Sequence, residues 1–150
     1  MSKPKTMPKI KNVMTPFPHS VQKNAPIEIA QQFMREHHLH HLPVTENNKV
    51  IGIISDRDIK LILGPDFGYP AGKELCVEDA YLPNAYVVDL CSSLDEVLDT
   101  MASRHIGSAI VTKHDKLVGI FTHEDVCKSF ARFLREQCPE PDHGGGDDAA

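Results

Sequence analysis

Residues 50–59 read VIGIISDRDI, and residues 117–126 read LVGIFTHEDV. In each stretch a glycine interrupts an apolar run, and a hydroxyl-x-x-Asp step follows it. The offset of 67 residues between Gly52 and Gly119 also separates Asp58 from Asp125. Matching glycines, apolar neighbours and acidic residues at one constant offset indicate that the chain contains two copies of one supersecondary unit.

The hydrophobic spacing predicts the elements of the first copy. A short strand near 18–22 precedes an amphipathic helix, and a strand from 42, a polar turn at 46–49 and a return strand at 50–54 follow. Ser55 is the expected N-cap of a second helix that ends at Gly64. The buried face of the amphipathic helix is expected to consist of Ile27, Ala30, Phe33 and Met34.

The second copy predicts the same order. A short strand near 85–88 comes before a helix opened by a Ser93-x-x-Glu96 capping box. Strands at 108–111 and 117–121 form a hairpin, and Thr122 caps the final helix. The apolar stripe of that helix contains Val126, Phe130, Phe133 and Leu134.

The predicted fold is therefore α/β, with two β-α-β-β-α repeats in a pseudo-twofold arrangement. A single unit of roughly 60 residues buries too little surface to be stable alone, so the copies are expected to pack through their sheets. The predicted organisation is a flexible lead-in at 1–11, the first repeat at 12–63, a linker at 64–76, the second repeat at 77–137 and a disordered acidic and glycine-rich tail at 138–150.

Composition limits the classes of function. A net charge of −5 argues against nucleic acid as the main partner, because phosphate contacts need clustered Lys and Arg. No apolar stretch approaches the roughly 20 residues that span a bilayer, and no signal-peptide core is visible, so a cytoplasmic location is expected. The four cysteines lack a C-x-x-C pairing and are expected to be free thiols, with Cys127 buried in the last helix.

The repeated hydroxyl-x-x-Asp step has two chemical interpretations. A helix N-terminus attracts anions, so Ser55 and Thr122 could contact a phosphate while the aspartates accept hydrogen bonds from a ribose diol. Glycine three residues earlier would let a ligand approach the strand backbone. The same spacing also matches an ordinary capping box, and the residues alone leave both interpretations open.

Five motifs resemble the signatures of a known family. Residues 12–16 read NVMTP, 41–44 read HLPV and 51–58 read IGIISDRD; 106–111 and 117–125 repeat the last two in looser form. Their order and spacing resemble a tandem pair of CBS domains (cystathionine β-synthase type), also called a Bateman module. The resemblance covers about residues 12–130.

The resemblance implies a regulatory module that binds an adenosine ligand (AMP, ADP, ATP or S-adenosylmethionine) in two clefts between the repeats, with no other cofactor required. Asp58 and Asp125 would hold ribose, Ser55 and Thr122 would meet phosphate or ribose, and Arg57 could neutralise phosphate. The Asp58 cleft would further contain Ile53, Ala85, Tyr86, Leu39 and Ile106. The Asp125 cleft would further contain Ile120, Thr15, His19, Leu39, His40 and Ile106.

Two departures from the family pattern predict unequal clefts. The second copy has Tyr81-Leu82-Pro83 where the first has Met-Thr-Pro. Glu124 replaces Arg57, so the Asp125 cleft should tolerate less phosphate charge unless His40 or His41 supplies a positive charge from across the interface.

No further domain is recognisable, so the output is expected to be a conformational or oligomeric change that a separate effector protein reads. A homodimer is expected, with Phe130, Phe133 and Leu134 of the final helix forming the surface through which the two copies contact each other. The alternatives are a structural dimerisation scaffold with empty clefts and, with less support, an enzyme that modifies a nucleotide. A metal site is not expected, because no carboxylate or cysteine completes a tetrahedral set with the histidines of 37–41.

Overall fold

The computed structural model describes residues 5–64 and 74–139. Most of the predicted linker and of the C-terminal tail therefore lies outside the described residues. The tandem α/β arrangement predicted from the sequence is confirmed. The elements of the first repeat are β2 (Val21–Gln22), α1 (Ile27–His37), β3 (His41–Glu46), β4 (Lys49–Ser55) and α2 (Asp56–Leu63). Those of the second are β5 (Val87–Asp89), α3 (Leu94–Arg104), β6 (Ser108–Lys113), β7 (Lys116–Thr122) and α4 (His123–Gln137).

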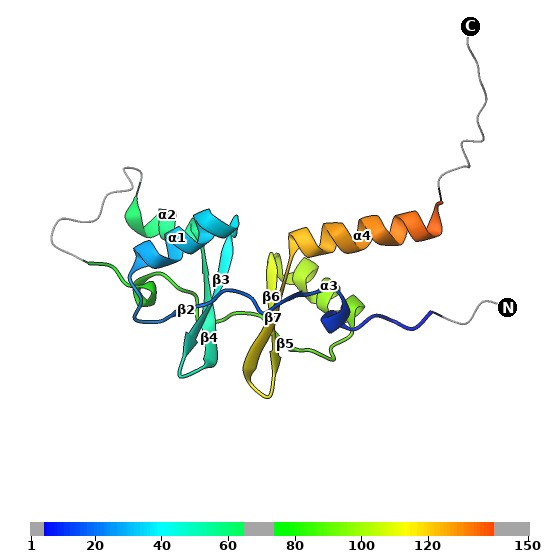
Figure 1. Ribbon diagram of the computed structural model, residues 1–150, viewed down its shortest axis with the longest axis horizontal. Helices are drawn as coiled ribbons and strands as arrows, with labels where there is room; N and C mark the ends of the chain where they lie inside the picture. The colour runs from blue at the N-terminus through cyan, green and yellow to red at the C-terminus, as the bar shows by residue number, and fades with distance from the viewer. Residues whose placement is uncertain (1–4, 65–73, 140–150) are drawn as a thin grey trace, which may run out of the picture.

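The strands form a mixed sheet in the order β2-β3-β4-β7-β6-β5. Within each repeat the first short strand pairs in parallel with the second, and the hairpin strands pair antiparallel. The repeats join where Lys49 of β4 pairs with Lys116 of β7. Figure 1 shows β4 and β7 near the middle of the molecule, with the helices of each repeat on its own side.

Each hairpin closes through a two-residue turn with left-handed backbone. Asn47 and Asn48 have φ of 52° and 62°, and His114 and Asp115 have φ of 50° and 64°. Positive φ at both turn residues matches the right-handed twist of the flanking strands. The turns therefore set the same register in both hairpins, and that register brings Ser55 and Thr122 to equivalent helix starts.

The two cores exchange their lead-in segments. Ile10, from the short 3-10 helix η1 (Ile10–Asn12), is fully buried among the apolar side chains of the second repeat. Val77, from η2 (Val77–Asp79), is fully buried in the first repeat. Backbone hydrogen bonds from Ile10 N to Ser92 O (2.9 Å) and from Val77 N to Ala25 O (2.8 Å) fix both crossings. The part of the predicted flexible lead-in around Ile10 is thus structured.

Two local predictions were wrong. The Ser93-x-x-Glu96 capping box does not form, because the Ser93 hydroxyl donates to Asp95 instead and makes no cap hydrogen bond. Cys127 is exposed rather than buried, since the beginning of α4 turns Asp125 toward the body of the protein.

Candidate functional site

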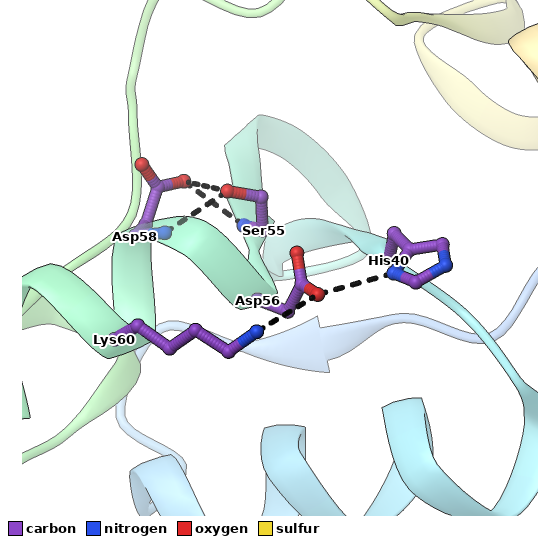
Figure 2. Close-up of polar contacts among 5 residues, drawn as sticks. All are labelled: His40, Ser55, Asp56, Asp58 and Lys60. Carbon is purple, nitrogen blue, oxygen red and sulfur yellow. Dashed lines mark hydrogen bonds and ion pairs between the residues drawn. The ribbon is translucent and has the colours of Figure 1, made fainter. Parts of the chain in front are cut away.

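The first candidate site is the start of α2, with Asp58 at its centre. Asp58 Oδ2 accepts hydrogen bonds from Ser55 N (2.9 Å) and Ser55 Oγ (2.8 Å), and Asp58 N donates to Ser55 Oγ at 3.1 Å. Figure 2 shows the two bonds from Ser55 converging on one carboxylate oxygen of Asp58 while the other oxygen points away. Asp58 is half-buried, and no hydrogen bond from another described residue reaches its Oδ1. The capping box therefore uses only one oxygen and leaves the second available.

The second candidate site is the start of α4, with Asp125 at its centre. Asp125 Oδ2 accepts from Thr122 N at 2.9 Å and from Thr122 Oγ1 at 3.3 Å. Asp125 Oδ1 accepts from Thr15 Oγ1 at 2.9 Å, a contact that joins residues 110 positions apart. Asp125 as a whole residue is only 8% exposed. Thr15 reaches it because β1 (Thr15–Pro16) pairs antiparallel with β7, placing Thr15 opposite Ile120.

Gly52 and Gly119 serve a different contact from the one expected. A Cβ atom at Gly52 would lie 2.6 Å from Tyr81 Cδ2 and closer still to the backbone oxygen of Leu82. A Cβ atom at Gly119 would collide with the side chain of Met14. The close approach is thus made by the crossing lead-in of the other repeat, and the expectation that these glycines face a ligand is not supported.

Histidines and acidic residues surround the start of α2. His40 Nδ1 lies 3.1 Å from Asp56 Oδ2, and Lys60 Nζ lies 3.8 Å from the same oxygen (Figure 2). Partial burial acts to raise the pKa of Asp56, but the hydrogen bond with His40 and the charges of His40 and Lys60 outweigh it and lower that pKa. Burial lowers the pKa of His41, against the attraction of Asp56 and Asp58. His41 is consequently held toward its neutral form.

The start of α4 lies within electrostatic range of these groups. The charge of His123 helps to lower the pKa of His41. The charge of His40 likewise helps to lower the pKa of Glu124. Glu124 forms an ion pair with Lys128 at 2.9 Å. The fold therefore brings charged groups of both repeats together near the two helix starts.

Within the described parts of the chain, the remaining predicted site residues lie on the surrounding elements and form no hydrogen bond or ion pair with either aspartate. The His19 ring stacks on the His37 ring of α1 at 3.9 Å, and the Tyr86 ring lies 5.4 Å from the Arg104 guanidinium of α3. Leu39 packs on the first core and Ile106 on the second. Ile53 belongs to β4, Ala85 is half-buried just before β5, and Arg57 is exposed on α2.

Sequence reasoning missed two members of this region. Leu82 lies opposite Ile53 in the first repeat, just as Thr15 lies opposite Ile120 in the second. The Ile53 backbone N donates a hydrogen bond to the Leu82 backbone O at 3.0 Å. Asp56 binds His40. The constant 67-residue offset was the available signal for Leu82, because it aligns Thr15 with that position. Asp56 carried no signal, because its histidine partner comes from a different element.

Neither the surface depressions nor the metal-binding residue types of the described chain identify a further site. A depression beside α1 and α2 includes Leu39, His40 and Asp56 among its lining residues, but neither Asp58 nor Asp125. Across residues 5–64 and 74–139, no three His, Cys, Asp or Glu side chains are grouped so that they could hold a metal ion. In the same ranges, no helix has the length and apolar character needed to span a bilayer.

Comparison with known proteins identifies the repeats. The family model described as "CBS domain" matches the chain twice, at residues 10–64 and 78–132. The chain belongs to the CBS domain family. The recognition of a tandem CBS pair from its motifs is therefore confirmed, whereas the repeat boundaries at 12–63 and 77–137 stay predictions.

Relatives of this CBS pair include proteins of similar length. Hypoxic response protein 1 of Mycobacterium tuberculosis is 28% identical over 127 residues, which cover 79% of this chain and 85% of that protein. The crystal structure of a protein assigned to acetoin utilization (AcuB) from Vibrio cholerae has a TM-score of 0.76 and 25% identity, and the match covers 91% of this chain and all of that one. The CBS domain pair of protein MJ0100, crystallised with 5′-methylthioadenosine and S-adenosylmethionine, has a TM-score of 0.72 and 25% identity over 82% of this chain and 99% of that chain.

Proposed function

We propose that the chain is a regulatory module that binds an adenosine ligand at the Asp58 and Asp125 sites. The observation that carries the proposal is the pair of equivalent helix starts, each with a hydroxyl residue and an aspartate behind a sheet strand. A carboxylate suits the vicinal diol of a ribose because it has several acceptor positions, and the adjoining helix N-terminus suits a phosphate or another anion. The similarity to MJ0100, crystallised with two adenosine derivatives, supports the same ligand class.

The surrounding residues are proposed to complete the two sites. In the Asp58 cleft, the purine would lie between apolar side chains, and the lining residues would be Ile53, Leu39, Ile106, Ala85 and Tyr86. In the Asp125 cleft, the apolar residues Ile120, Leu39 and Ile106 would contact the purine, and Thr15, His19 and His40 would also line the cleft. Arg57 is exposed and forms no ion pair with another described residue, so it is free to meet a phosphate. Its counterpart Glu124 is acidic and paired with Lys128, which supports a smaller tolerance for phosphate at the Asp125 site.

The output of the module is proposed to be a change of conformation or assembly, read by a separate effector protein in the cytoplasm. No reaction is assigned to the chain. Along α4, Phe130, Phe133 and Leu134 are 58%, 51% and 43% exposed, and the two phenylalanine rings stack at 6.3 Å. Exposed apolar side chains in such a row are typical of protein contact surfaces, which supports a homodimer through α4.

A thermal-shift panel of AMP, ADP, ATP, NADH and S-adenosylmethionine tests the proposal. A ligand that binds only the folded protein raises the melting temperature by mass action. We expect a saturable rise with at least one adenosine ligand, reduced by Asp58→Ala and by Asp125→Ala to different extents. An unchanged melting temperature across millimolar ligands would instead favour a scaffold without a ligand. Conversion of AMP or ATP to a product, lost in Asp58→Ala, would indicate an enzyme.

A further inference from the structure

The two aspartates differ in how their carboxylates are already bound within the chain. Asp125 is 8% exposed, with Oδ1 engaged by Thr15 and Oδ2 by Thr122. Both oxygens of this buried carboxylate therefore have partners. A hydrogen bond to an ionised acceptor is roughly twice as strong as a neutral one, so the Thr15 contact is costly to break.

Asp58 has no equivalent of the Thr15 contact. The position opposite Ile53 is occupied by Leu82, which pairs there as Thr15 pairs opposite Ile120. A leucine side chain has no hydroxyl to donate. Among the described residues only Ser55 donates to the Asp58 carboxylate, and both of its bonds go to Oδ2.

We propose that Thr15 is a specificity-determining residue that competes with the ligand for the Asp125 carboxylate, so that the Asp58 site fills first. The inference rests on the proposed function, in which a ribose diol binds the aspartate. At Asp58 the diol finds Oδ1 open. At Asp125 the Thr15 hydroxyl already occupies Oδ1 of a buried residue, so the diol competes with that hydrogen bond and binds more weakly.

Displacement of Thr15 would also allow ligand binding at the Asp125 site to affect the N-terminal lead-in segment. Thr15 lies on β1, and the preceding residues Ile10, Val13 and Met14 pack on the core of the second repeat. Thr15 itself is exposed, so its release uncovers little apolar surface. Occupation of the Asp125 site thus acts on the lead-in that links the repeats, at ligand concentrations above those that fill the Asp58 site.

Calorimetric titration with AMP, and in parallel with S-adenosylmethionine, tests the competition. Asp58→Ala isolates the Asp125 site, and Thr15→Val is then added to remove the hydroxyl at nearly constant volume. We expect Thr15→Val to tighten binding about tenfold, which corresponds to about 1.4 kcal/mol. Thr15→Ser restores a hydroxyl and is expected to restore the weaker binding. Equal or weaker binding by Thr15→Val overturns the proposal, because the hydroxyl would then contact the ligand or have no part in its affinity.

The reciprocal variant places the same hydroxyl at the other site. Leu82→Thr, in an Asp125→Ala background, is expected to weaken binding at the Asp58 site; Leu82 is 53% exposed, so the change spares the core. An unchanged affinity contradicts the proposal. Failure of the proposed function differs from failure of the competition. If the proposed function is wrong, neither the wild type nor any variant binds AMP or S-adenosylmethionine. If the wild type binds the ligand but Thr15→Val does not tighten that binding, only the competition is overturned.

Discussion

At the scale of single residues, the chain uses the same side chain for folding and for its candidate site. Asp58 caps α2 through one carboxylate oxygen and keeps the other free. The capping and ligand-binding interpretations of the hydroxyl-x-x-Asp step are therefore compatible, since one carboxylate has enough acceptor positions for both. Gly52 and Gly119, in contrast, are explained by packing alone, because the crossing segments lie directly against them.

Alanine at the two repeat glycines should destabilise the protein unequally. The atom that a Gly52 Cβ would meet first is the backbone oxygen of Leu82, whereas at Gly119 it is the flexible end of Met14. Overpacking of this kind costs about 1–3 kcal/mol, so we expect Gly52→Ala near the upper end and Gly119→Ala near the lower. Urea denaturation measures both. Gly107→Ala is the control, because its Cβ would lie an ordinary 3.4 Å from His123; equal losses in all three variants would contradict the packing explanation.

The lowered pKa of His41 predicts a loss of stability in mild acid. Burial disfavours the charged imidazole in the folded state, so the unfolded chain binds a proton more readily. The free energy of unfolding should therefore fall as the pH drops through the unfolded value of about 6.5, and level off below the folded pKa. Denaturation curves between pH 8 and 5 measure this, with His41→Gln expected to flatten the fall. An equal or steeper fall in the variant would show that the loss arises elsewhere.

At the scale of elements, the exchange of lead-in segments decides how the two repeats depend on each other. Hydrogen bonds from Ile27 N to Leu75 O (3.0 Å) and from Leu94 N to Pro8 O (2.9 Å) tie the start of each first helix to the lead-in of the other repeat. Leu75 and Val77 are buried in the first repeat, and Ile10 is buried in the second. Neither core is complete without a segment from outside its own repeat.

Truncation of Ile10 should therefore weaken the distant repeat more than the adjacent one. Ile10→Ala removes a fully buried side chain from the second core and is expected to cost about 2–5 kcal/mol. Amide hydrogen exchange should show faster exchange in α3 and β6 than in α1 and β3. Exposed Lys11 offers the matched control, Lys11→Ala. Faster exchange confined to the first repeat would contradict the crossing.

At the scale of the whole molecule, the repeat architecture could be predicted because both copies carry the same apolar spacing and turn residues. The 67-residue offset held even for residues that share no motif, such as Thr15 and Leu82. The family resemblance placed Thr15 in the Asp125 cleft, but the hydrogen bond between these two residues could not be predicted from the residue spacing, because it depends on β1 crossing to β7. The absence of a capping box at Ser93 likewise could not be predicted from the sequence, because it depends on the Ser93 hydroxyl donating to Asp95 instead.

The exposed face of α4 predicts that the protein forms a dimer in solution. Replacing Phe130 and Phe133 together by serine removes two apolar side chains that are more than half exposed, so folding should be preserved while association weakens. Light scattering coupled to size exclusion should change from dimer to monomer. Arg132→Ala, on the same helix, is the control; a wild-type protein that is already monomeric would contradict the prediction.

The ligand sites themselves are tested most directly by a crystal structure of the protein with the adenosine ligand that stabilises it most. The predicted result is electron density for a ribose whose hydroxyls lie within hydrogen-bond distance of the Asp58 carboxylate, with the Asp125 site filling only at higher ligand concentration. Density for the ligand elsewhere on the molecule, or both aspartates bound solely by the protein's own side chains at saturating ligand, would contradict it.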